Sequence, residues 1–79
     1  MNVQTSDGRV LSGTALEIVQ AMQRLAFGAD RFSLLEYIAW TVANVAAMGH
    51  DMIVTGVSEP ERAASLLDQL VAAGLLVHR

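Results

Sequence analysis

Residues 33–48 are long enough for a helix and are apolar around most of the helix circumference. After the first residue, the plainly polar positions in this segment are Glu36, Thr41 and Asn44. A surface helix of a globular domain needs one apolar stripe, whereas a helix that is apolar nearly all round must be covered on several sides. The segment is therefore expected to be covered by the rest of its own domain or by another molecule.

The length of 79 residues predicts a single domain that covers residues 1–79. A chain of this size buries only about 60% of its unfolded surface on folding, so it needs a rich core. The 53% of hydrophobic residues can supply one, and the absence of cysteine excludes disulfides and zinc-thiolate sites. An ordered globule is expected.

The charge balance argues against nucleic-acid binding. Eight acidic residues oppose five basic ones, for a net charge of −3, and no stretch of the chain concentrates the bases. Affinity for DNA or RNA rests largely on several basic side chains that meet phosphates together. All five bases are arginines: Arg9, Arg24, Arg31, Arg62 and Arg79.

The chain shows no signal for export or for membrane insertion. Residues 1–13 lack the basic start and apolar stretch of a secretory signal. The longest apolar segment is shorter than the roughly twenty residues that cross a bilayer. A soluble, cytoplasmic protein without a membrane partner is expected.

Residues 2–12 carry the pattern of a β-hairpin. Asp7 and Gly8 suit the two positive-φ positions of a type I′ turn, which would place Thr5 opposite Val10. The side chains would then alternate between two faces. One face would hold Val3, Thr5 and Val10, and the other Gln4 and Leu11.

Three capping boxes predict where helices begin. In each, a Ser or Thr is followed three residues later by Glu, so that each side chain can bond the other residue's main-chain amide. With the apolar periodicity that follows them, they predict helices over residues 14–26, 33–48 and 58–73. The pairs are Thr14 with Glu17, Ser33 with Glu36, and Ser58 with Glu61.

Residues 52–55 and 75–77 are short apolar runs beside glycine and predict two further strands. The fold class that follows is α+β, a small two-layer domain in the order ββααβαβ. Its three helices would pack with a small, mostly antiparallel sheet, and helix 33–48 would be central. The alternative is a three-helix bundle with the hairpin as an appendage.

No catalytic, cofactor or metal site is expected. His50 and Asp51 could form a general base with its orienting carboxylate, but adjacent residues between a helix and a strand are typical of a turn. His78 has no second ligand at metal-binding spacing. Because the carboxylates in first helical turns have capping roles and no phosphate-binding glycine motif is present, neither an enzyme nor a small-molecule substrate is inferred.

Tyr37, Trp40, Asn44 and Ala47 follow one another along one side of helix 33–48. One interpretation is ordinary packing of a helix that is wetted along a narrow strip. The other is a contact surface, because Trp and Tyr are enriched in interface cores and their polar groups suit a half-wet site. These four residues are the candidate partner-binding residues.

Two resemblances bear on function. Residues 7–19 read D-G-x-x-x-x-G-T-x-x-E-I-V and residues 33–40 read S-L-x-E-Y-I-x-W, and together they resemble small uncharacterised proteins of bacteria and phages. That resemblance implies no activity. Residues 66–79 are similar to the helix-then-strand passage that ends in the wing of winged-helix regulators, although the chain stops before a second wing strand.

The function predicted is a small, non-enzymatic interaction protein, a regulator or inhibitor, that self-associates as a homodimer through helix 33–48 or binds another protein. The alternative is a winged-helix-like DNA-binding regulator. The alternative requires that four of the arginines converge on one face, namely Arg24, Arg31, Arg62 and Arg79.

Overall fold

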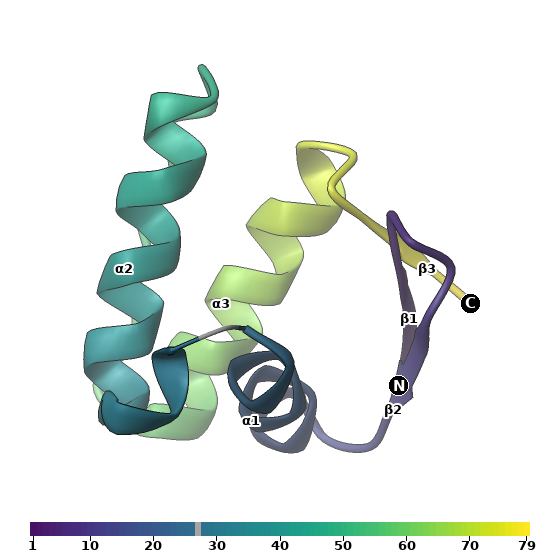
Figure 1. Ribbon diagram of the computed structural model, residues 1–79, viewed down its shortest axis with the longest axis horizontal. Helices are drawn as coiled ribbons and strands as arrows, with labels where there is room; N and C mark the ends of the chain where they lie inside the picture. The colour runs from purple at the N-terminus through teal and green to yellow at the C-terminus, as the bar shows by residue number, and fades with distance from the viewer. Residues whose placement is uncertain (27) are drawn as a thin grey trace.

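The computed structural model describes residues 1–26 and 28–79. The α+β class is confirmed: three helices accompany a small antiparallel sheet (Figure 1). The elements, in chain order, are β1 (Asn2–Thr5), β2 (Val10–Ser12), α1 (Ala15–Leu25), the 3-10 turn η1 (Ala29–Arg31), α2 (Leu34–Ala47), α3 (Glu59–Ala72) and β3 (Leu76–His78).

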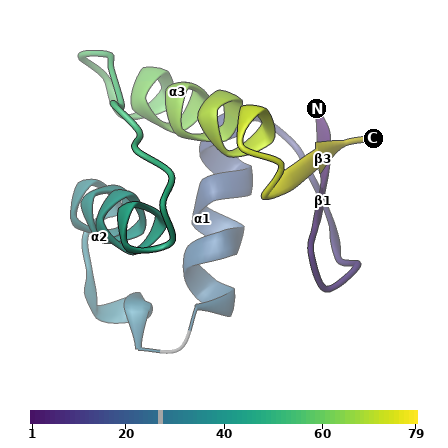
Figure 2. The same ribbon diagram turned by 90° about the horizontal axis from the view of Figure 1, so that it is seen from above.

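The sheet has the order β2-β1-β3, and both pairings are antiparallel. The last strand therefore pairs with the first, and the two chain ends lie close together (Figure 2). Val3, at the centre of β1, stands opposite Leu11 of β2 and His78 of β3. This pairing ties the end of the chain to its beginning.

The hairpin turn differs from the predicted type I′ turn. Gly8 N–H donates to the carbonyl of Thr5 at 3.0 Å, and Thr5 N–H donates to the carbonyl of Arg9 at 2.8 Å, so the loop has three residues. Gly8 has a φ of 90°, but no non-glycine residue in the described part of the chain has a positive φ, so Asp7 cannot occupy a type I′ position. The prediction of a two-residue turn was therefore wrong. The hairpin has a three-residue loop instead, which needs a left-handed conformation only at Gly8.

The longer loop shifts the register by one residue and so changes which side chains face the core. Leu11, not Ser12, stands opposite Val3, and Gln4, not Thr5, stands opposite Val10. Leu11 packs against the core with Val3, whereas Val10 is 54% exposed on the outer face. The predicted grouping of Val10 with Val3 was therefore wrong.

All three helices begin at their predicted capping boxes, with both reciprocal hydrogen bonds present in each. Each box works within four consecutive residues and does not depend on the rest of the fold. The ends of α2 and α3 also agree with the sequence, since main-chain bonds from Gly49 and Gly74 close their last turns. Three local signals therefore place all three helices.

The core lies between α1, α3 and the sheet. Its most completely buried large side chains are Ile18, Leu66, Leu67, Val3 and Val19. Both α1 and α3 contact the sheet and each other, while α2 packs against these two helices at the side away from the sheet (Figure 2). The expectation that α2 would be central was therefore wrong.

Residues 52–55 do not form the predicted strand. They connect α2 to α3, on the side of the molecule opposite the sheet (Figure 2). Their main chain is held by α3 side chains instead: Gln69 bonds Ile53, and the Ser65 hydroxyl accepts from Thr55 N–H at 3.0 Å. The apolar run of Met52 and Ile53 was predicted to be part of a strand, and that prediction was wrong because α3 side chains, not a strand, take up its main-chain hydrogen bonds.

Candidate functional site

The side of α2 that faces away from the core is mostly apolar. Its exposed residues, which we call the α2 outer face, are Leu35, Glu36, Ala39, Trp40, Ala43, Asn44, Ala46 and Ala47. Glu36 is the only charged residue of this set. The exposed sides of α1 and α3 are more polar, with residues such as Glu17, Gln20 and Arg24 on α1. The α2 outer face therefore differs in kind from the other helix surfaces.

Three of the four predicted contact residues lie on this face. Trp40 is 39% exposed, and Asn44 and Ala47 are also exposed. Tyr37 is different, because only 4% of it is exposed and its ring belongs to the core. The spacing placed Tyr37 on the same side as Trp40, but that position lies at the edge of the face, turned toward α1, and is covered.

An aromatic cluster holds Trp40 near the middle of α2. Tyr37 and Trp40 stack with ring centroids 5.8 Å apart and an interplanar angle of 26°. The ring of Phe32 lies 6.2 Å from Trp40 on a tilted plane. Such offset aromatic pairs add stabilisation beyond the area they bury, so Trp40 is anchored although it is partly exposed.

The polar side chains of α2 bond largely to their own helix. The Asn44 amide donates to the Trp40 carbonyl at 2.7 Å, and the buried Thr41 hydroxyl donates to the Tyr37 carbonyl at 2.9 Å. Glu36 accepts from the Ser33 N–H at 2.9 Å within its capping box. The α2 outer face therefore offers few free hydrogen-bond donors or acceptors to a partner.

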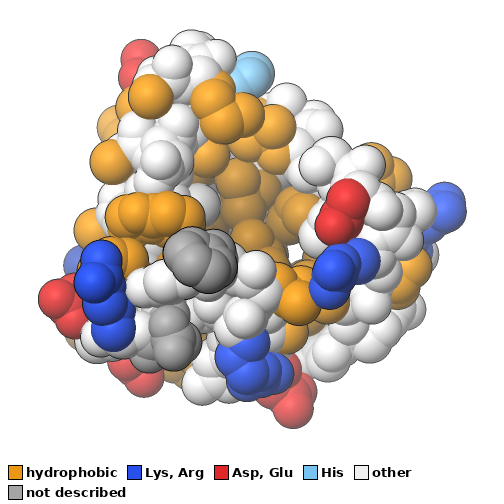
Figure 3. Space-filling view, viewed as in Figure 1, with side chains coloured by type: hydrophobic (Ala, Val, Ile, Leu, Met, Phe, Trp, Pro, Cys, Tyr) orange, Lys and Arg blue, Asp and Glu red, His pale blue; other side chains and the backbone are white. Residues whose placement is uncertain are grey.

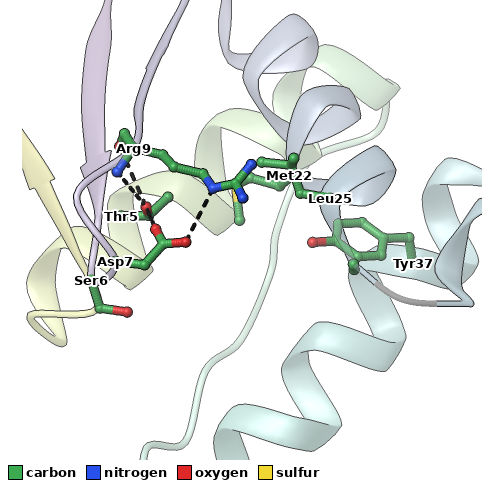
Figure 4. A pocket seen from close by; sticks show the side chains of 8 residues that line it. Thr5, Ser6, Asp7, Arg9, Met22, Leu25 and Tyr37 are labelled. Atoms are coloured by element: carbon green, nitrogen blue, oxygen red, sulfur yellow. Dashed lines mark hydrogen bonds and ion pairs between the residues drawn. The ribbon is translucent and has the colours of Figure 1, made fainter.

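A cavity of about 320 Å³ lies between the hairpin loop and α1, where hydrophobic side chains gather in a hollow (Figures 3 and 4). It was not predicted, because its walls come from segments far apart in the sequence and no local pattern joins them. The lining residues are Thr5, Ser6, Asp7, Arg9, Met22, Leu25, Ala26 and Tyr37.

Two titratable groups of this cavity have shifted pKa values. A hydrogen bond from the Thr5 hydroxyl is the main cause that lowers the pKa of Asp7, and Arg9 adds to it. Burial raises the pKa of Tyr37, partly opposed by the neighbouring Thr41 hydroxyl. At neutral pH the cavity therefore holds the Asp7 carboxylate and the protonated Tyr37 phenol.

His50 and Asp51 are exposed and line a second cavity of about 350 Å³ together with Gln69. The Gln69 amide is already bonded to the main chain of Ile53. In residues 1–26 and 28–79, no group of three or more His, Asp or Glu side chains could hold a metal ion. The turn after α2 lies at Met48 and Gly49, so the prediction of a turn at His50 and Asp51 was wrong by two residues, and these two residues belong to the connection between α2 and α3.

The first-turn carboxylates act as helix caps. The pKa values of Glu17 and Glu36 are lowered, chiefly by bonds from the main-chain amides of Thr14 and Ser33. The pKa of Glu61 is lowered in the same way, mainly by the Ser58 hydroxyl and then by its amide. Each carboxylate is ionised and engaged by its own cap.

The arginine side chains do not gather on the face shown in Figure 3, where the Lys and Arg groups are dispersed among acidic and uncharged ones. They come from the hairpin, α1, η1, α3 and the end of the chain.

Within the described part of the chain, no helix has the length and apolar character needed to cross a membrane.

Comparisons with protein-family models, with curated proteins and with solved structures found no match for this chain. The resemblance to small bacterial and phage proteins therefore stays a hypothesis.

Proposed function

We propose that this protein is a small, non-enzymatic interaction module that self-associates through the α2 outer face. The observation that carries the proposal is the composition of that face. Six of its eight exposed residues are apolar, and its only carboxylate is bonded to the cap of its own helix. Exposed apolar surface of this kind typically marks a site of association.

The α2 outer face of one copy can pack against the same face of a second copy. The alanines at positions 39, 43 and 47 recur every four residues and so form one row along the helix. Two such rows can approach closely, and an antiparallel pair would set the Trp40 ring of one copy beside the Ala43 row of the other. A contact that uses one patch twice is the commonest route to a homodimer.

The size of the face predicts weak association. A helix of 14 residues is about 21 Å long, and one side of it is much smaller than the roughly 800 Å² that each partner buries in a stable complex. The dimer should therefore be transient, and its population should depend strongly on protein concentration.

The test is solution mass, measured by light scattering or sedimentation at low and high protein concentration. The parent protein should shift from monomer toward dimer as the concentration rises, and Ala43→Glu should stay monomeric. Ala43 is exposed and makes no core contact, so this variant should keep its fold. Gln20→Glu adds the same charge to the exposed side of α1 and should dimerise like the parent.

Trp40 provides a second measurement because it is the only tryptophan of the chain. Its emission should move to shorter wavelength as the parent protein is concentrated, and should not move in Ala43→Glu. A monomer mass that does not change with concentration would rule out self-association.

The DNA-binding alternative has no comparable support. Winged-helix regulators place a basic helix in the major groove. No basic residue lies within α2, and α3 contains only Arg62, in its first turn beside Glu59 and Glu61.

A further inference from the structure

The cavity between the hairpin loop and α1 brings together groups that self-association does not use. Its two walls differ in chemistry (Figure 4). The wall from the hairpin is polar, with Thr5, Asp7 and Arg9, while the wall from α1 is apolar, with Met22 and Leu25. Ligand sites commonly combine an apolar lining with a few convergent polar groups.

The polar wall has unused hydrogen-bond donors. Both oxygens of the Asp7 carboxylate already accept a bond, one from the Thr5 hydroxyl and the other from Arg9 Nε at 3.1 Å. Among the described residues, the two terminal nitrogens of Arg9 make no hydrogen bond or ion pair. An arginine fork suits two-point binding of a carboxylate, so these two nitrogens can receive one although the charge of Arg9 is already paired with that of Asp7.

Tyr37 adds a donor from the opposite side. Only 4% of this residue is exposed, and its hydroxyl points across the cavity toward the hairpin in Figure 4. The single proton of the Thr41 hydroxyl is donated to the Tyr37 carbonyl, and no hydrogen bond of the Tyr37 phenol is found in the described part of the chain. Among the described residues no fully buried side-chain oxygen or nitrogen lacks a hydrogen-bond partner, so the Tyr37 hydroxyl is reached by solvent from the cavity and its proton is available to a ligand acceptor.

We propose that this cavity binds a small organic acid whose carboxylate lies between the Arg9 guanidinium and the Tyr37 hydroxyl. The apolar body of the ligand would rest against Met22 and Leu25. The volume of about 320 Å³ lies at the lower end of the range of roughly 300 to 1,000 Å³ for ligand pockets, so the acid must be small. Inorganic anions would leave the apolar wall unused.

Trp40 can report binding because its ring stacks on that of Tyr37, 5.8 Å away. The probe is phenylacetate, a small acid with an apolar ring, and the matched control is phenylacetamide, which has the same shape without the charge. Titration of each should be followed by Trp40 emission and by calorimetry. Phenylacetate is expected to bind about tenfold more tightly than phenylacetamide, because a hydrogen bond to a charged carboxylate is stronger than one to a neutral amide.

Two variants separate the polar contributions. Arg9→Gln and Tyr37→Phe should each weaken phenylacetate binding several-fold and should remove most of the preference for the acid. Tyr37→Phe keeps the buried ring, and circular dichroism with a thermal melt checks its fold. Arg24→Gln removes the same charge from the exposed side of α1 and should bind phenylacetate like the parent.

Three outcomes would overturn the proposal: no saturable binding of phenylacetate, equal affinity for the acid and the amide, or unchanged affinity in folded Arg9→Gln and Tyr37→Phe. The inference is independent of self-association, because Ala43→Glu lies outside the cavity and should bind phenylacetate like the parent.

Discussion

The side chain of Gln69 in α3 pairs with the main chain of Ile53 as a neighbouring strand would. Its carbonyl oxygen accepts from the Ile53 N–H at 2.8 Å, and its amide nitrogen donates to the Ile53 carbonyl. The two bonds hold the connection between α2 and α3 beside a helix, on the side of the molecule opposite the sheet (Figure 2). Gln69 thus takes the part of the strand partner that residues 52–55 lack.

Gln69→Ala should therefore destabilise the protein, by about 1 to 2 kcal/mol, because two hydrogen bonds to the main chain of Ile53 are lost, each worth about 0.5 to 1.5 kcal/mol. The amide of Ile53 should also exchange with solvent faster. Chemical denaturation and amide hydrogen exchange measure the two effects. Asp68→Ala, at the exposed neighbouring position, is the control and should be near neutral.

The hairpin register predicts opposite outcomes for two adjacent residues. Leu11→Thr should destabilise the protein by about 1 to 3 kcal/mol, because Leu11 packs on the core, whereas Val10→Thr should have little effect on the exposed face. Denaturation midpoints of the two variants decide the matter. A larger loss of stability in Val10→Thr than in Leu11→Thr would mean that the type I′ register is the correct one.

The loop itself can be tested at Gly8, which has a φ of 90°. Gly8→Val should lower the melting temperature because a β-branched residue tolerates this conformation poorly. Gly8→Asn should melt closer to the parent, since asparagine adopts left-handed conformations more readily. Equal melting of both variants would contradict the turn geometry.

Two leucines of α3 should be essential to stability. Leu67 and Leu70 are 1% and 4% exposed, so Leu67→Ala and Leu70→Ala should each cost roughly 2 to 5 kcal/mol. A domain this small has little stability to spare, and either variant could be largely unfolded at 37 °C. Circular dichroism and thermal melts provide the measurement. Near-parental stability of both would contradict the position of α3 in the core.

Stability should fall on acidification because of the three capping glutamates. Their pKa values are lower in the folded chain than the ordinary value of 4.5, so the stability they provide is present above that value and is lost as the pH falls through the folded pKa values. Urea midpoints between pH 6 and pH 3 measure the loss. A variant with glutamine at positions 17, 36 and 61 should show a weaker dependence on pH.

The sequence predicted those features that depend on near neighbours along the chain. Each capping box involves two residues three positions apart, so Ser33 and Glu36 mark the start of α2 whatever surrounds it. The buried faces of α1 and α3 follow from helical spacing for the same reason. The last strand also agreed with its prediction to within one residue.

The candidate site was predicted only in part. Helical spacing correctly placed Trp40, Asn44 and Ala47 on one side of α2, but it could not show that Tyr37 is covered by the packing against α1. The cavity was missed entirely because Arg9 and Tyr37 lie in different elements. Their relation exists only after the hairpin and α2 have packed on α1.

By itself, the sequence determined the three helices, their boundaries and the apolar surfaces they must bury, because these depend on bonds and periodicities within a few residues. Only the tertiary structure decided the hairpin register, the hydrogen bonds of Ile53 to Gln69 instead of to a strand, and the position of α2 at the side of the core. These features depend on which surfaces meet across the fold, and burial against distant neighbours outweighs the local preference of any short segment.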